Sequence, residues 1–193
     1  RARQTIVISP DMRDRFAGGV PASQLHLVPP VGPTPVASRP ASLVRAELGL
    51  GPTVPLVVLV GRLHPQKDVA SLIQATVALD PAVQVVVVGE GPDRAGLEAD
   101  ARRLGVEGRV HLVGARAQAA DYQSAADVVV MCSIWEGFGL VVAEALHLAR
   151  PVVATAVGPV PTMVIDGVTG RLVPPSDPAA LAAAITDLLA DRD

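Results

Sequence analysis

The sequence of 193 residues has one cysteine, Cys132, and only 2% aromatic residues. A single cysteine excludes an internal disulfide and a cysteine-rich zinc module. With so few aromatic rings, any core must be built from aliphatic side chains. The 16 basic and 19 acidic side chains give a net charge of −3. Because there is no basic block either, we do not expect a nucleic-acid-binding protein.

Segments that could cross a membrane are missing as well. The longest uncharged stretch, residues 17–38, contains five prolines and cannot form a membrane helix. No basic leader precedes an apolar stretch at the N-terminus, so we expect a cytoplasmic protein. Half of the residues are hydrophobic, which argues against a disordered chain.

A proline-rich segment at residues 30–40 is expected to be a linker. Beyond it, continuous apolar runs alternate with helical patterns, which indicates an α/β domain at residues 41–193. We expect a Rossmann-like, doubly wound parallel sheet of about six strands. The expected strands are 56–60, 83–88, 109–113, 127–131, 151–154 and 172–173, and the expected helices are about 67–79, 93–104, 118–125, 140–149 and one that Asp177 caps.

Ligands bind beyond the carboxyl ends of the strands in such a sheet, so the loops there are the candidate sites. The loop after residues 56–60 carries Gly61, Arg62 and Lys67, the only lysine in the chain. We expect Lys67 to open the next helix, where the unpaired backbone N–H groups favour anions. Two cations there suit a phosphate or diphosphate. Taken alone, this loop is explained equally well as an ordinary solvated turn.

The loop after residues 127–131 carries the strongest pattern. Two glycines around Phe138 precede the helix expected at Leu140, so backbone N–H groups can face a ligand at the start of that helix. Glu136 lies just before the helix and Glu144 one turn inside it. Each carboxylate can accept a pair of sugar hydroxyls, with a phosphate held between them on the backbone N–H groups.

Other residues have simpler explanations. The Gly89-Glu90-Gly91 turn lacks the third glycine of a dinucleotide fingerprint and is interpreted as a helix-capping turn. The histidines show no ligand-like clustering. The Asp-Arg-Asp sequence at residues 191–193 is expected to be a solvated tail rather than a metal site.

Together these segments resemble the group 1 glycosyltransferases of glycosyltransferase family 4, which are retaining enzymes with the GT-B fold of two Rossmann-like domains. The resemblance rests first on Glu136 and Glu144, which are separated by seven residues around Gly-Phe-Gly. Four further segments match in the same order: 61–67, 89–92, 166–170 and 173–178. They cover about residues 56–189, which is most of the chain.

This resemblance implies that residues 41–193 are the donor-binding domain, one half of a GT-B fold, of a retaining hexosyltransferase that uses a nucleoside-diphosphate sugar. Residues 1–29 would then be the last elements of an N-terminal acceptor domain. That domain would supply the acceptor site and any peripheral membrane contact, so this chain alone is expected to bind the nucleotide but to transfer no sugar. The base, the sugar and the acceptor are left open.

The resemblance also implies roles for individual residues. Arg62 and Lys67 would stabilise the departing diphosphate, and Glu136 would contact the donor sugar, which makes these three the expected catalytic residues. Because two cations and a helix N-terminus can neutralise the leaving group, we expect neither a metal nor a cofactor. The expected substrate-binding residues are Gly61, Gly137, Phe138, Gly139, Leu140, Glu144 for the ribose diol, and Arg116 beside Ala115 at the base.

Two alternatives are kept. A sugar-nucleotide epimerase of the same fold would be expected to lack the paired glutamates. A non-catalytic nucleotide-binding module is suggested by Pro159 and Thr162, which stand where family members often carry glycine and glutamate. The joint presence of both cations and both glutamates favours the transferase.

Overall fold

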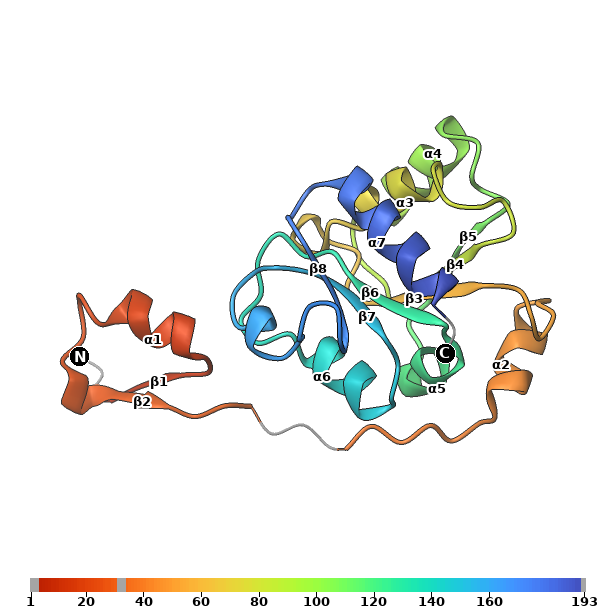
Figure 1. Cartoon of the computed structure of the whole chain (residues 1–193). Coiled ribbons are helices and arrows are strands. Elements are labelled where there is room, and N and C mark those ends of the chain that lie inside the picture. Colours follow the sequence, from red (N-terminus) through yellow and green to blue (C-terminus); the bar gives the residue numbers. More distant parts are fainter. Residues whose placement is uncertain (1–3, 31–33, 192–193) are drawn as a thin grey trace.

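The computed structural model describes residues 4–30 and 34–191, and within them the strands form two parallel sheets (Figure 1). The smaller sheet pairs β1 (Thr5–Val7) with β2 (Leu25–Leu27), and α1 (Pro10–Phe16) lies between them in sequence. The larger sheet has six strands in the order β5-β4-β3-β6-β7-β8. These strands are β3 (Leu56–Val60), β4 (Gln84–Val88), β5 (Val110–Gly114), β6 (Val128–Met131), β7 (Val152–Thr155) and β8 (Gly170–Val173). The expected α/β fold with about six parallel strands is confirmed.

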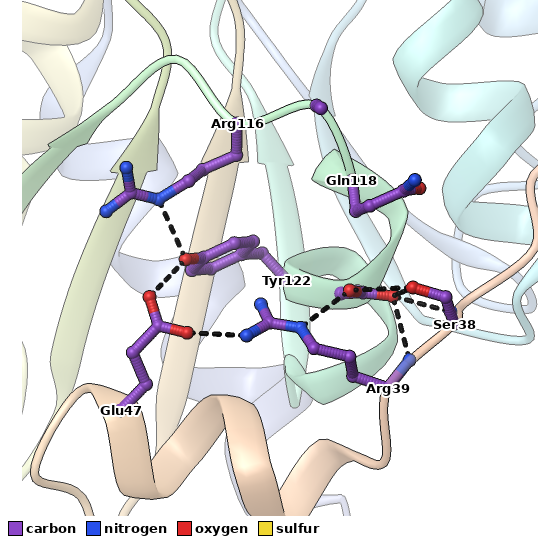
Figure 2. Close-up of a pocket in the computed structure, with 8 residues that line it drawn as sticks. Ser38, Arg39, Glu47, Arg116, Gln118 and Tyr122 are labelled. Atoms are coloured by element: carbon purple, nitrogen blue, oxygen red, sulfur yellow. Dashed lines mark hydrogen bonds and ion pairs between the residues drawn. The ribbon is translucent and has the colours of Figure 1, made fainter.

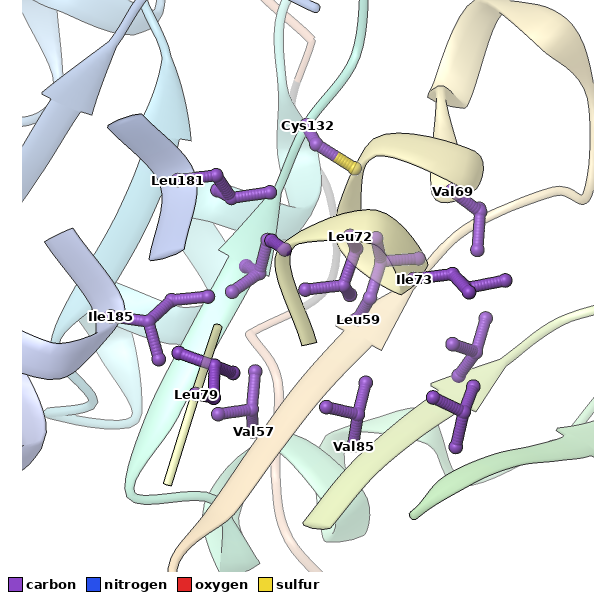
Figure 3. Packing of buried hydrophobic residues seen from close by; sticks show 14 of the residues in the cluster. Val57, Leu59, Val69, Leu72, Ile73, Leu79, Val85, Cys132, Leu181 and Ile185 are labelled. Carbon is purple, nitrogen blue, oxygen red and sulfur yellow. The ribbon is translucent and has the colours of Figure 1, made fainter. Parts of the chain in front are cut away.

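Helices cover both faces of the larger sheet (Figure 1). One face carries α3 (Val69–Thr76), α4 (Arg94–Arg103) and α7 (Pro178–Ala190); the other carries α2 (Ala41–Glu47), α5 (Ala119–Ala125) and α6 (Leu140–His147). Alternate residues of each strand point to opposite faces of the sheet and belong to two hydrophobic cores, one under each helix layer. This is why the strands are apolar on both faces. Figure 3 shows Leu72 and Ile185 of the first layer packed over Val57, Leu59 and Val85 of the sheet.

The strand order reverses at β3. The chain passes from β3 to β4 and β5 on one side, and then returns to β6 on the other side of β3 before reaching β7 and β8. The loop after β3 leads to α3 on one face, whereas the loop after β6 leads to α6 on the opposite face. Such a divergence leaves a crevice at the carboxyl ends of the two strands.

The start of α3 differs from the expectation. Lys67 does not open this helix: it ends a single 3-10 turn, Pro65–Lys67, and α3 begins at Val69. Asp68 between them has a left-handed backbone (φ 46°), which interrupts the helical path. The His64 Nδ1 accepts a hydrogen bond from the Gln66 N–H at 3.3 Å and so caps the 3-10 turn.

Parts of three expected segments lie outside the described residues: residues 1–3 of the expected N-terminal remnant, residues 31–33 of the expected linker, and residues 192–193 of the Asp-Arg-Asp tail. Within the described part, α2 begins directly after Pro40. None of the helices in the described ranges has the length and hydrophobicity that a bilayer crossing requires.

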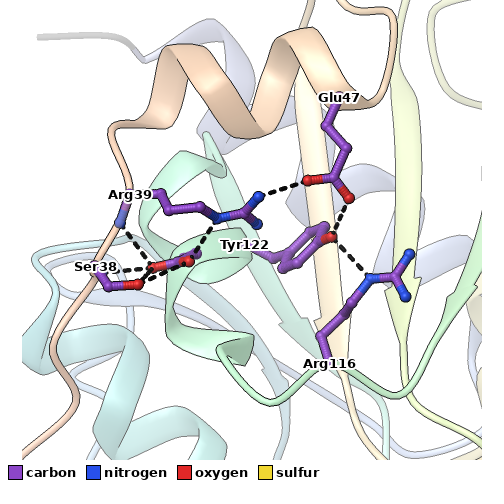
Figure 4. Close-up of polar contacts among 6 residues, drawn as sticks. Ser38, Arg39, Glu47, Arg116 and Tyr122 are labelled. Carbon is purple, nitrogen blue, oxygen red and sulfur yellow. Dashed lines mark hydrogen bonds and ion pairs between the residues drawn. The ribbon is translucent and has the colours of Figure 1, made fainter.

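A buried carboxylate, that of Asp121, fastens the segment before α2 to α5. Its side chain is 0% exposed. It accepts hydrogen bonds from the Ser38 N–H at 2.6 Å, the Arg39 N–H at 3.2 Å and the Arg39 Nε at 2.8 Å (Figure 4). Burial alone would raise the pKa of Asp121, but the hydrogen bonds from Arg39 and Ser38 outweigh it and lower the pKa below the ordinary value.

We expect Asp121→Asn to lower the free energy of unfolding by about 2 kcal/mol at pH 7, because a charged acceptor of several hydrogen bonds is lost. A lowered folded-state pKa contributes stability that is fully present above the unfolded pKa of about 3.9 and is lost as the pH falls through the folded value. The difference between the two proteins in urea unfolding should therefore close below about pH 3.9. Asp187→Asn, at an exposed position on α7, is the control and should leave stability unchanged. An Asp121→Asn difference that persists undiminished in acid would contradict this.

Candidate functional site

The loops after β3 and β6 are joined by a set of direct hydrogen bonds. The Ile134 N–H donates to the Gln66 carbonyl at 2.8 Å, and the Gln66 side-chain amide donates to the Trp135 carbonyl at 3.0 Å. The Cys132 thiol donates to the Lys67 carbonyl at 3.2 Å. Burial raises the pKa of this thiol to about 12, so it remains a donor at neutral pH. These bonds hold the Lys67 loop against the Glu136 loop.

Lys67 and Glu136 form an ion pair at this junction, with the lysine ammonium donating to the glutamate Oε1. The Ser133 hydroxyl donates to the same oxygen at 2.7 Å. The Lys67 side chain is 23% exposed and that of Glu136 only 8%. The loop after β7 packs against the Glu136 backbone, since a Cβ at Gly158 would lie 2.4 Å from the Glu136 carbonyl oxygen. The glutamate is therefore fixed by three loops.

A cavity of about 350 Å³ opens beside this pair. Gly139 has φ +87° just before the first residue of α6, a conformation that suits glycine. Within the described part of the chain, the backbone N–H groups of residues 137–141 donate to no protein acceptor. They are thus available to an anion at the start of the helix. The lining residues are Ile8, Pro30, Val60, Lys67, Glu136, Gly137, Phe138, Gly139, Leu140 and Val141.

A second cavity, of about 210 Å³, adjoins the first at Val60 and lies over the carboxyl ends of β3, β4 and β5. The Arg62 side chain is exposed and has no hydrogen-bond or ion-pair partner among the described residues. Arg116 is also exposed and donates from Nε to the Tyr122 hydroxyl at 3.0 Å. The two cavities share the lining residue Val60 and are together called the trough here; the cations Lys67, Arg62 and Arg116 line it. The second is lined by Val60, Gly61, Arg62, Val88, Gly89, Glu90, Ala115, Arg116 and Ala119.

Glu144 is the one expected site residue that lines neither of these cavities. It lies on α6 one turn beyond Leu140 and is partly buried. Burial raises the pKa of its carboxyl above the ordinary value. No described residue forms a hydrogen bond or ion pair with its carboxylate, so the group is available to an external donor.

Comparison with known protein families identifies the family of this chain. The model of the family described as "Glycosyl transferases group 1" matches residues 42–193. The chain belongs to the group 1 glycosyl transferases. The resemblance to the group 1 glycosyltransferases is thus confirmed.

Relatives and solved structures agree with this assignment. The chain is 39% identical over 186 residues to a D-inositol 3-phosphate glycosyltransferase of Xylanimonas cellulosilytica, covering 90% of this chain and 45% of the relative. It is 38% identical over 190 residues to the enzyme of the same name from Nocardia farcinica, covering 91% and 42%. The chain thus spans less than half the length of these two relatives.

Among solved structures, HepE of Anabaena in complex with UDP and glucose superposes with a TM-score of 0.90 at 28% identity, covering 98% of this chain and 54% of that one. Sucrose-phosphate synthase of Thermosynechococcus elongatus superposes with a TM-score of 0.84 at 35% identity, covering 96% and 49%. The fold of this group 1 glycosyl transferase is therefore the Rossmann-like half of a GT-B fold, as expected.

Several residues of the candidate site were not predicted from the sequence. Ser133 and Gln66 support Glu136 and its loop, while Ile8 and Pro30 line the first cavity from the segment around β1 and β2. The position of Ser133, two residues after a buried strand, is a signal that could have found it. The long-range contacts of Ile8 and Pro30 have no such signal. Among the described residues no group of three or more His, Cys, Asp and Glu side chains is arranged to hold a metal ion.

Proposed function

We propose that this chain binds a nucleoside-diphosphate sugar in the trough and supplies the groups that stabilise the departing diphosphate during sugar transfer to an acceptor hydroxyl. The observation that carries the proposal is the junction of the β3 and β6 loops at the switch point of the sheet. There Lys67, Glu136 and the unbonded N–H groups at the start of α6 line one cavity. Family membership favours transfer over the epimerase alternative.

The two ends of the trough suit the two ends of a nucleotide sugar. The end beside Gly61 and Ala115 offers backbone groups and Arg116 to a base, and Arg62 lines the same cavity, which shares Val60 with the cavity of Lys67. The first cavity would then hold the β-phosphate and the sugar. HepE has been solved with UDP, and with UDP-glucose, on the same fold, which supports UDP as a probe.

The chemistry follows from charge. As the bond between the sugar and the diphosphate breaks, negative charge grows on the leaving phosphate. The Lys67 ammonium and the N–H groups at the α6 N-terminus are donors held in place by the fold, and the exposed Arg62 guanidinium adds a further positive charge; together they stabilise it without a metal ion. Glu136 orients Lys67 through their ion pair and offers its second oxygen to a sugar hydroxyl.

We extend the proposal to three finer points that rest on the Glu136–Glu144 pattern and its resemblance to family 4. These are retention of the anomeric configuration, a hexose as the transferred sugar, and an acceptor site supplied by an N-terminal domain. A cytoplasmic location belongs to the same proposal. NMR of the first-formed product would decide between retention and inversion.

Calorimetric titration of the chain with UDP tests the proposal. We expect saturable binding that weakens with salt, because the contacts are ionic. No sugar transfer is expected from this chain alone. Titration with UDP, GDP and ADP in parallel identifies the base, and absence of binding by all three would contradict the proposed function.

Glu144→Gln separates ligand binding from stability. A raised folded-state carboxyl pKa means that the ionised form is disfavoured in the fold, so stability is lost as the pH rises through that value. At pH 7 we therefore expect the amide to unfold in urea at the same midpoint or a slightly higher one. UDP affinity should fall about 10-fold, because a charged acceptor for the ribose diol is lost. Glu107→Gln, at an exposed position with the same charge change, should alter neither. A loss of stability with unchanged affinity would assign Glu144 to the fold instead.

A further inference from the structure

Arg116 belongs to two cavities at once. It lines the base end of the trough, and it also lines a separate cavity of about 280 Å³ between α2 and α5 (Figure 2). The lining of this separate cavity also includes Ser38, Arg39, Glu47 and Tyr122. What happens among these side chains can therefore reach the trough through Arg116.

A continuous chain of hydrogen bonds leads to Arg116 from the segment before α2 (Figure 4). The Arg39 Nε donates to the buried Asp121 carboxylate at 2.8 Å, and the Arg39 Nη1 donates to one oxygen of Glu47 at 2.6 Å. The Tyr122 hydroxyl donates its single proton to the other oxygen of Glu47 at 2.8 Å. Its lone pairs then face the Arg116 Nε, which donates to it at 3.0 Å. The direction of each hydrogen bond in this chain is therefore defined.

This chain of hydrogen bonds is buried at Tyr122 and exposed at Arg116. Tyr122 is 1% exposed and lies on α5 within the core, with the Arg39 guanidinium 5.8 Å from the centre of its ring. Arg116, in contrast, is exposed, and among the described residues its terminal nitrogens form no hydrogen bond or ion pair, although its charge helps to lower the pKa of Glu47. An exposed arginine loses much rotamer freedom when it binds a ligand. A bond at Nε limits this loss beforehand and leaves both Nη groups for the ligand.

We propose that Tyr122 is a positioning residue for nucleotide binding: held by Glu47, it orients Arg116 so that the two Nη groups face the nucleotide at the base end of the trough. This inference rests on the proposed function, since it needs the nucleotide to bind there. Tyr122 itself does not touch the ligand. Its whole effect passes through Arg116.

A double-mutant cycle measured as UDP affinity tests this. We expect Arg116→Ala to weaken UDP binding about 10-fold and Tyr122→Phe about 5-fold. In the Arg116→Ala background, Tyr122→Phe should have no further effect. Arg102→Ala removes the same charge at an exposed position on α4 and should leave affinity unchanged.

The outcomes are distinct. Additive losses, about 50-fold in the double variant, or an unchanged affinity of Arg116→Ala would overturn the inference while leaving the proposed function standing. Failure of the unaltered chain to bind any nucleotide would instead contradict the proposed function. If Tyr122→Phe does not fold, Glu47→Ala is the second variant. It removes the acceptor of the phenol proton at a partly exposed helix position and should show the same non-additivity.

Discussion

Replacement of Lys67 with alanine is expected to lower UDP affinity about 100-fold, and kcat/KM for sugar transfer in the complete protein by at least as much. Two effects combine. The ammonium that we propose to contact the diphosphate is lost, and the Glu136 carboxylate, 8% exposed, is left as an unpaired negative charge beside the proposed phosphate site. Calorimetry with UDP measures the first quantity, and initial rates at low donor concentration measure the second.

A second variant separates the contribution of Lys67 to the ligand from its contribution to the fold. Lys67→Ala alone should also be less stable, because an unpaired, mostly buried carboxylate is costly. Lys67→Ala with Glu136→Gln removes that charge, so its unfolding midpoint should return towards that of the unaltered chain. UDP affinity should remain well below the original value. If affinity recovers together with stability, Lys67 acts through the fold and does not contact the diphosphate.

Gly89→Ala is expected to have the largest effect on stability, a loss of about 4 kcal/mol. Gly89 has φ +151°, and a Cβ there would lie 1.8 Å from the Gly61 carbonyl oxygen. The backbones of the loops after β3 and β4 touch at this point, and the Leu63 N–H donates to the Glu90 carbonyl at 3.0 Å. Because the obstacle is backbone, neither loop can yield without moving its strand. Urea unfolding measures the loss.

Gly96→Ala is the matched control. Gly96 lies on the exposed side of α4, and a Cβ there would meet nothing within 4 Å. Alanine should therefore stabilise the helix by about 0.5–1 kcal/mol. Similar effects of the two substitutions, in either direction, would contradict the backbone contact that we describe.

Much of the fold could be predicted from the sequence because the sheet is parallel and buried on both faces. Strands β3, β4 and β6 are continuous apolar runs, and the structure places them within a residue of the expected ranges. β8 begins at Gly170, two residues before the expected start. Its first two residues carry no apolar signal, although Gly170 is required there: a Cβ would lie 2.1 Å from the Val152 carbonyl.

Features that depend on distant partners could not be predicted. Helix α2 was not expected, because only Val44 and Arg45 are buried in it. Arg45 is held by Asp127, 82 residues away. The Gly89-Glu90-Gly91 turn was interpreted as a helix cap. The pattern of glycines gave no indication of the β3 loop that lies against it.

The candidate site could likewise be predicted only in part. The rule that ligands bind at the carboxyl ends of parallel strands predicted the loops after β3 and β6 as candidate sites. The single lysine and the two glutamates indicated the candidate residues within them. The ion pair between Lys67 and Glu136 spans 69 residues. The chain of hydrogen bonds from Asp121 to Arg116 passes through Arg39 and Glu47, which are far from both in sequence. Such contacts follow from the strand order, which a pattern of apolar runs does not specify.

Binding of the donor diphosphate in the first cavity, where the β3 and β6 loops meet, is tested most directly by a crystal structure of the chain with UDP. We predict the β-phosphate within hydrogen-bond distance of the Lys67 Nζ and of the backbone N–H groups that begin α6, with the base beside Ala115. UDP in another cavity, such as that beside Asp127 and Arg150 at the amino ends of β6 and β7, would contradict the account. So would a diphosphate bound away from Lys67.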